Sequence, residues 1–223
     1  MDVKLLCQAV VKFLAGVLLT GVLVFVPART IHFMNGWILM CVLFGPMFIA
    51  GLVLVVRSPE LLKKRLASKE KESEQKVVVA LSGLMFIASF ILAGLDFRFG
   101  WTSLPDWTPW AGAGIFILAY LMYAEVMREN AYLSRTIEVH QGQKVVDTGL
   151  YGIVRHPMYS ATVFLFLSMP LILGSLVSFA VMLLYIPIIS ARMKNEEKVL
   201  SASLPGYREY MQKVRYRIIP YIW

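Results

Sequence analysis

Two groups of polar residues near the end of the chain have the residue types that bind charged ligands. The first group is Arg155-His156-Pro157, which directly precedes a long apolar run. Proline is favoured in the first turn of a helix, so Pro157 predicts a helix that begins there, with His156 as its N-cap. The free N–H groups of such an N-terminus attract an anion, and Arg155 can bind a carboxylate or phosphate beside them. Contact of Arg155 and His156 with lipid phosphates explains the same residues equally well.

The second group is Arg192-Met-Lys-Asn-Glu196-Glu197. If a helix continues past Ser190, Arg192 and Glu196 lie one turn apart on the same face. A surface ion pair between them is the simpler explanation. Two adjacent carboxylates so close to an apolar run can also bind the hydroxyls or the ammonium group of a polar, cationic cofactor.

The elements that must position these residues are apolar helices. The chain is 58% hydrophobic and 16% charged, whereas soluble domains are about 45–50% apolar and about 25% charged. This composition excludes a conventional soluble or disordered protein. Four apolar stretches have about the 20 residues that cross a bilayer; they are 5–26, 36–56, 77–95 and 110–127.

A fifth apolar run covers residues 158–190 and is too long for one crossing. As one straight helix it would extend about 50 Å, at about 1.5 Å per residue. Pro170 and Gly174-Ser175 interrupt it, so we expect two helices folded into a hairpin. The short halves predict tilt, local thinning of the bilayer, or a hairpin that does not fully reach the far face. A hairpin brings the Arg155 group and the Arg192 group to the same rim of the membrane.

The distribution of basic residues supports six crossings. With six, 19 of the 22 Lys and Arg residues fall on one side of the membrane, which the positive-inside rule identifies as cytoplasmic. The net charge of +8 therefore reflects cytoplasmic loops and predicts no nucleic-acid partner. We expect an all-α, multi-pass membrane protein, with a single domain over 1–223 and its polar site on the cytoplasmic face. Four helices fill 1–127, and 128–223 forms the core around the hairpin.

The segment before the hairpin and the remaining polar residues carry weaker signals. Residues 137–139 and 144–146 are β-prone and bounded by glycines, which predicts a small extended or looped excursion. Glu125 lies near the end of a crossing, and pairing with Arg128 is favoured over a functional role. The histidines other than His156 are isolated, so no metal site is expected.

An ordered set of motifs in the last third of the chain resembles the isoprenylcysteine carboxyl methyltransferase family. The motifs are Gly149-Leu-Tyr151, Arg155-His156-Pro157-Met-Tyr159, the helical hairpin, Arg192-x-x-x-Glu196-Glu197 and Tyr207-x-x-Tyr210. The phospholipid methyltransferases share a weaker version of the pattern. The similarity covers residues 133–223, and the first four helices match only as hydrophobic spans.

The resemblance implies an integral membrane enzyme that uses S-adenosylmethionine and releases S-adenosylhomocysteine. The residues that it implies for cofactor binding are Gln143, Lys144, Val145, Val146, Tyr151, His156, Pro157, Met158, Tyr159, Glu196 and Glu197. It implies catalytic roles for Arg192, which engages the substrate carboxylate, and for Arg155 in support. Family members that act on prenylated proteins often have His in place of Gln143, a departure that bears on the substrate more than on the cofactor.

The function expected is methyl transfer to a carboxylate of a lipophilic molecule or lipidated protein within the membrane lipids. Amine methylation of a phospholipid is the alternative enzymatic reading. A small membrane transporter or scaffold is the non-enzymatic alternative. A transporter should have polar residues deep within several helices, whereas the polar groups here gather at one rim. No sequence feature predicts an oligomeric state.

Overall fold

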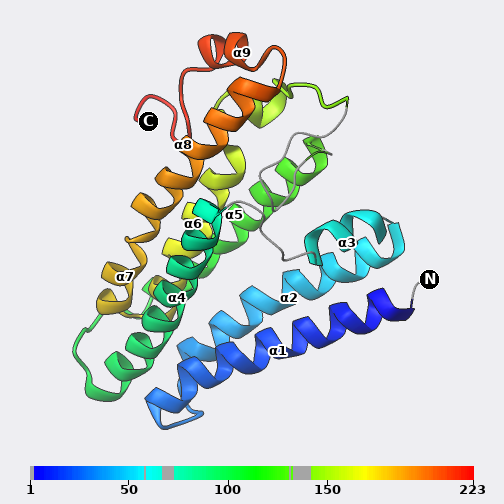
Figure 1. Cartoon of the computed structure of the whole chain (residues 1–223). Helices are drawn as coiled ribbons and strands as arrows, with labels where there is room; N and C mark the ends of the chain where they lie inside the picture. The colour runs from blue at the N-terminus through cyan, green and yellow to red at the C-terminus, as the bar shows by residue number, and fades with distance from the viewer. Residues whose placement is uncertain (1–2, 58, 67–72, 131, 133–141) are drawn as a thin grey trace.

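The computed structural model describes residues 3–57, 59–66, 73–130, 132 and 142–223. This part of the chain is helical and contains no strand (Figure 1), which confirms the predicted all-α class. The helices are α1 (Val3–Ala28), α2 (Met34–Arg57), α3 (Pro59–Leu66), α4 (Ser73–Phe99), α5 (Thr108–Glu129), the 3-10 helix η1 (Gly149–Gly152), α6 (Pro157–Leu173), α7 (Leu176–Met182), α8 (Tyr185–Ser203) and α9 (Tyr207–Lys213).

Five helical spans are long and apolar enough to cross a membrane. They are Lys4–Ala28, Met34–Arg57, Lys76–Phe99, Thr108–Glu129 and Leu176–Ser203. The shorter apolar helix α6 precedes the last of them. The four predicted N-terminal stretches are therefore helices, and the chain is a multi-pass membrane protein.

The predicted hairpin is present, and its turn lies at Gly174-Ser175. Gly174 adopts a left-handed conformation with φ of 74°, which ends α6 and which glycine adopts without strain. The Ser175 hydroxyl then caps α7 by accepting the N–H of Ser178 at 3.1 Å. Pro170 lies inside α6 and does not break the helix there. The second arm continues through α7 and α8 to Ser203, well past the predicted end at Ser190.

A buried aspartate fixes this turn against the end of α4. Asp96 is 2% exposed, and its carboxylate accepts the N–H of Thr102 at 2.8 Å and the Thr102 hydroxyl at 2.6 Å. The Ser175 hydroxyl donates to the same carboxylate. Because these bonds join the end of α4 to the turn, they fix the turn at the end of the molecule far from α9 (Figure 1).

Two buried clusters hold the helices together. In the first, Phe33, Leu39, Phe116 and Ile172 bring α2, α5 and α6 together. In the second, residues of α4, α6 and α8 pack with Ile218, which follows α9. The helices α1 and α2 form an antiparallel pair beside this bundle (Figure 1), and both expose many large apolar side chains, as helices that face lipid do.

The connection from α5 to α6 agrees with the predicted extended or looped excursion where the structure describes it. Residues 144–146 have no regular secondary structure, and 137–139 lie outside the described residues. At the end of α5, Arg128 Nε and Nη2 donate to the Glu125 carboxylate at 2.8 and 2.6 Å, so the predicted pair is confirmed.

Candidate active site

The helix η1 is tied to the end of α5. Gly149 has φ of 50°, and a side chain at this position would overlap the Glu129 carboxylate. That carboxylate accepts the N–H of Leu150 at 3.1 Å. Asn130 Nδ2 donates to the Tyr151 hydroxyl at 3.0 Å. Tyr151 is thereby fixed, largely buried, just before the entrance of α6.

The entrance of α6 has the predicted geometry. His156 is the N-cap residue and Pro157 the first residue of the helix. The backbone N–H groups of Arg155 and His156 donate to the carbonyls of Tyr216 and Arg217 at 2.9 and 2.8 Å. The segment that follows α9 therefore lies directly against the entrance of α6.

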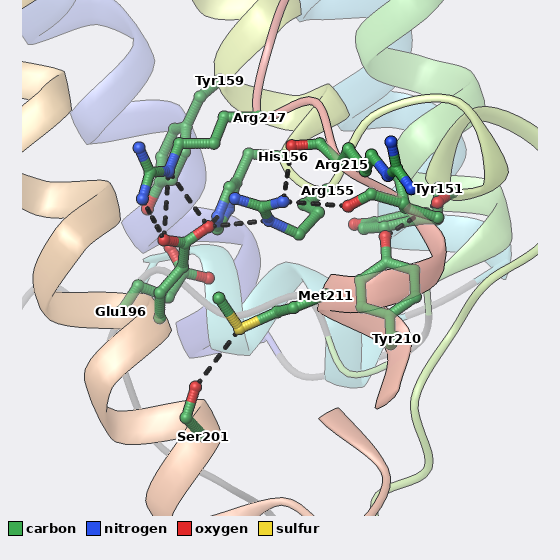
Figure 2. Close-up of polar contacts among 12 residues, drawn as sticks. Tyr151, Arg155, His156, Tyr159, Glu196, Ser201, Tyr210, Met211, Arg215 and Arg217 are labelled. Carbon is green, nitrogen blue, oxygen red and sulfur yellow. Dashed lines mark hydrogen bonds and ion pairs between the residues drawn. The ribbon is translucent and has the colours of Figure 1, made fainter. Parts of the chain in front are cut away.

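A buried ion cluster, which we call the Glu197 cluster, lies at this junction (Figure 2). It consists of Glu197, Arg155, His156 and Arg217. The Glu197 side chain is 7% exposed and accepts from Arg155 Nε at 2.8 Å and from Arg217 Nη2 at 2.9 Å. His156 Nε2 lies 3.3 Å from the same carboxylate. The anion expected at the N-terminus of α6 is therefore supplied by the chain itself.

Arg155 also holds the backbone that follows α9. Its Nη1 donates to the carbonyls of Val214 and Arg215 at 2.9 and 2.8 Å. The guanidinium is thus engaged in contacts within the protein on both its Nε and its Nη1 side. A buried charge with several such partners is costly to leave unpaired, so this cluster constrains the relative position of α6, α8 and the final segment.

The other acid of the doublet belongs to a second cluster. The Tyr159 hydroxyl donates to Glu196 Oε2 at 2.5 Å and accepts from Arg192 Nε at 2.9 Å. Arg192 and Glu196 lie one turn apart on α8, as the sequence predicts. The Tyr159 hydroxyl therefore connects Arg192 with Glu196. The family resemblance implies substrate binding for Arg192 and cofactor binding for Glu196.

A pocket, here called the α8 pocket, lies between α8, α9, the entrance of α6 and the segment 142–146. Its lining residues are Asn130, Tyr132, Gln143, Lys144, Val145, Val146, Tyr151, Arg155, His156, Met158, Tyr159, Glu196, Leu200, Leu204, Tyr207 and Tyr210. One end is polar, with His156, Tyr159 and Glu196. The other is apolar and aromatic.

The aromatic end rests on the helix α9. Leu204, Tyr207 and Tyr210 form a buried cluster against which Val145 packs. The Tyr210 hydroxyl donates to the carbonyl of Tyr151 at 2.7 Å (Figure 2). The Tyr207 hydroxyl is also buried, but among the residues that the structure describes it has no hydrogen-bond partner.

Burial determines the protonation of both tyrosines. It raises the pKa of the Tyr207 phenol well above its ordinary value, and the negative charges of Glu196 and Glu197 raise it further. Burial likewise raises the pKa of Tyr210. Both phenols are therefore neutral at physiological pH and can each donate one hydrogen bond.

The structure brings most of the predicted site residues together in one pocket. Within the described part of the chain, the predicted residues that are not in its lining are Pro157, Arg192 and Glu197. Pro157 begins α6, Arg192 contacts Tyr159 beside the pocket, and Glu197 lies in its own cluster.

Sequence reasoning did not assign several residues that the structure adds to the site. Leu200 and Leu204 follow Glu196 at intervals of four, so a helical repeat along α8 could have indicated them. Arg217 had no local signal, because its carboxylate partner is 20 residues earlier in the chain.

Comparison with known proteins agrees with the resemblance predicted from the motifs. Residues 107–205 match the family model described as phospholipid methyltransferase. This stretch runs from the start of α5 to the end of α8 and so includes both arms of the hairpin. It also contains both polar motifs.

A solved structure has the same fold. It is the eukaryotic intramembrane Ras methyltransferase, isoprenylcysteine carboxyl methyltransferase, with a TM-score of 0.61 over 96% of this chain and 77% of the other. The sequence identity is 19%. The predicted polytopic helical fold is therefore confirmed.

A curated relative is similar over a shorter stretch. The Delta(14)-sterol reductase TM7SF2 of Mus musculus is 31% identical over 91 residues, which are 40% of this chain. The match spans 22% of the reductase, about a fifth of its length.

Proposed function

We propose that the protein transfers a methyl group from S-adenosylmethionine to a carboxylate of a lipophilic, membrane-resident substrate, as in isoprenylcysteine carboxyl methylation. The observation that carries this proposal is the Tyr159 hydroxyl, which contacts both Arg192 and Glu196. Through this hydroxyl, Arg192, which is expected to hold the methyl acceptor, lies next to Glu196, which is expected to hold the cofactor. The match to a methyltransferase family and the shared fold support the reaction class.

The residues of the α8 pocket fit the chemistry of this cofactor. S-adenosylmethionine is a cation that also carries hydroxyl and amino groups, and the Glu196 carboxylate can attract the charge and accept hydrogen bonds. A purine has apolar faces, which suit the wall of Val145, Leu204 and Tyr210. In this proposal the remaining pocket contacts come from residues 143–146, Tyr151, His156, Met158 and Tyr159.

Three predicted residues receive positioning roles in the proposal. Arg155 and Glu197 hold the entrance of α6 against α8 through their buried ion pair. Pro157 fixes the residue at which α6 begins. These residues keep His156 and Tyr159 at the pocket without themselves engaging the acceptor.

The chain's own residues contribute orientation to the reaction. The bound cofactor supplies an activated methyl group on a positively charged sulfur. Arg192 holds the acceptor carboxylate through charge-assisted hydrogen bonds, and Tyr159 fixes Arg192 relative to Glu196. The cofactor would also provide its own leaving group, because its sulfur would keep the electron pair of the carbon–sulfur bond when the acceptor oxygen takes the methyl group. No proton moves, so the site needs no general base and relies on orientation and exclusion of water.

An apolar groove beside Arg192 provides a place for the substrate's hydrophobic tail. This α4–α8 groove has a volume of about 530 Å³ and is lined by Val77, Val78, Leu81, Pro187, Ile188, Ala191 and Asn195. Ala191 and Asn195 immediately precede Arg192 and Glu196 on α8. An acceptor lying in the groove would thus have its polar end next to Arg192, on the face that the basic loops mark as cytoplasmic.

Amine methylation of a phospholipid is the second candidate, and the matched family model favours it. A phospholipid ammonium group must lose a proton before its nitrogen can attack the methyl group. In this site Glu196 is the base that could take this proton, through the Tyr159 hydroxyl. The two reactions therefore differ in the product and in the need for a base.

Product analysis tests the proposal. Purified protein is incubated with methyl-labelled S-adenosylmethionine and a lipid extract, and the labelled product is treated with alkali. A methyl ester releases labelled methanol, whereas an N-methyl group keeps its label. Release of labelled methanol supports carboxyl methylation, and label that stays on the product after alkali supports amine methylation. If no product is labelled in the presence of the protein, both proposals are contradicted.

A further inference from the structure

The Tyr207 hydroxyl is an unusual group in this molecule. It is buried within a side chain that is 4% exposed, and it has no hydrogen-bond partner among the described residues. Leaving a buried hydroxyl unpaired costs free energy, so proteins seldom retain one without a reason. Tyr207 also lines the α8 pocket, so a ligand that fills this pocket would lie against the residue that carries the hydroxyl.

The surroundings indicate which part of a ligand this partner would be. The Tyr207 ring lies 5.7 Å from the Tyr210 ring, and both pack in the cluster that contains Leu204 and Val145. This wall suits a flat, largely apolar group such as a purine with its sugar. The charges of Glu196 and Glu197 act on the phenol and favour its neutral form, which keeps its proton available for donation.

We propose that the Tyr207 hydroxyl is a cofactor-binding group that hydrogen-bonds the nucleoside part of the S-adenosyl cofactor. This inference rests on the function proposed above and adds a residue to it. It gives Tyr207 a role different from that of Tyr210, whose hydroxyl is already bonded to the carbonyl of Tyr151 (Figure 2).

The proposal predicts opposite effects of one substitution on stability and on binding. Tyr207→Phe removes a hydroxyl that has no protein partner, so the ligand-free variant should melt at the same temperature as wild type or higher. Its affinity for S-adenosylhomocysteine should fall about five- to tenfold, the loss of one hydrogen bond. The matched control is Tyr210→Phe, which breaks a bond within the protein and should lower the melting temperature without ligand.

A fragment identifies the part of the cofactor involved. 5′-Methylthioadenosine contains the nucleoside and the sulfur but lacks the amino-acid end. Tyr207→Phe should weaken its binding, measured by calorimetry, by the same factor as that of S-adenosylhomocysteine. An effect on S-adenosylhomocysteine alone would overturn the assignment to the nucleoside.

Two further results would overturn the inference. The first is equal affinity of wild type and Tyr207→Phe for S-adenosylhomocysteine. The second is a fall in melting temperature as large as that of Tyr210→Phe, which would mean that the hydroxyl has a structural partner. Failure of the wild type itself to bind S-adenosylhomocysteine is a separate result and contradicts the proposed function.

Discussion

Glu196 and Glu197 are adjacent in the chain but serve different parts of the site. Consecutive residues of an α-helix point about 100° apart, so the two carboxylates leave α8 in different directions. Glu196 lines the α8 pocket and bonds to Tyr159, whereas Glu197 is buried against Arg155 and Arg217. The acidic doublet thus combines Glu196, which lines the pocket, with Glu197, which holds α6, α8 and the final segment together.

Substitution of Glu197 should therefore affect stability first. Glu197→Ala leaves Arg155 buried beside its other partners without a countercharge, and breaking a buried pair in this way costs about 3–5 kcal/mol. We expect a clear fall in the melting temperature of the purified protein in detergent. Glu125→Ala, which removes an exposed pair with Arg128, is the control and should melt like wild type. Equal melting of Glu197→Ala and wild type would show that the Glu197 cluster does not hold the fold.

Substitution of Arg192 should instead affect catalysis. Hydrogen bonds to charged groups contribute about 1.5–3 kcal/mol, so Arg192→Ala should lower kcat/KM for the methyl acceptor by about 10- to 150-fold. Affinity for S-adenosylhomocysteine should largely survive. Lys194→Ala, an exposed cation on the same helix, controls for charge and should turn over normally. Near-normal turnover of Arg192→Ala would mean that its assigned role is wrong.

At the scale of the elements, α8 separates the α8 pocket from the α4–α8 groove. One face carries the pocket residues Glu196 and Leu200. The neighbouring face carries Ile188, Ala191 and Asn195 of the α4–α8 groove. The cofactor and the substrate tail would therefore approach from either side of one rigid helix, with Arg192 between them.

Blocking the groove tests this division. Ala191→Trp should fill part of the groove, and we expect it to raise KM for a long-chain acceptor about tenfold or more, a loss of about 1.4 kcal/mol. Calorimetry should show unchanged affinity for S-adenosylhomocysteine. Ala191→Ser, which barely changes the volume, is the matched control. If Ala191→Trp methylates long-chain acceptors as wild type does, the tail lies elsewhere.

The hairpin could be predicted from local sequence, but its polar contacts could not. Gly174 and Ser175 indicated the turn because chain direction depends on local backbone preferences. Arg155 was expected to bind an external anion, and its actual partner Glu197 is 42 residues further along the chain. Two charges that a fold brings together over such a separation leave no periodic signal. The hydrogen bond between Ser175 and Asp96, which are 79 residues apart, could not be predicted from the sequence for the same reason.

At the scale of the whole molecule, the ends of the bundle have different chemistry. The helix α9 and the final segment lie at one end, and the turn between α6 and α7 lies at the other (Figure 1). The α8 pocket is lined by residues of α9, and the turn is held by Asp96. The basic loops predict that the pocket end faces the cytoplasm.

Cysteine labelling in intact bacterial cells that express the protein in their inner membrane, with an outer membrane that lets the reagent through, tests this orientation. After Cys7 and Cys41 are replaced, single cysteines are introduced as Gln212→Cys on α9 and Ser103→Cys beyond α4, both at exposed positions. A membrane-impermeant maleimide should label only Ser103→Cys in intact cells and both variants after permeabilisation. Labelling of Gln212→Cys in intact cells would reverse the orientation.

The central claim is that the α8 pocket binds an S-adenosyl cofactor through Glu196. Calorimetric titration of the purified protein with S-adenosylhomocysteine tests it most directly. We predict a saturable heat for wild type and for the exposed α9 control Glu209→Ala, and an affinity at least about tenfold weaker for Glu196→Ala. The absence of saturable heat with wild type, or equal affinity of Glu196→Ala and wild type, would contradict the account.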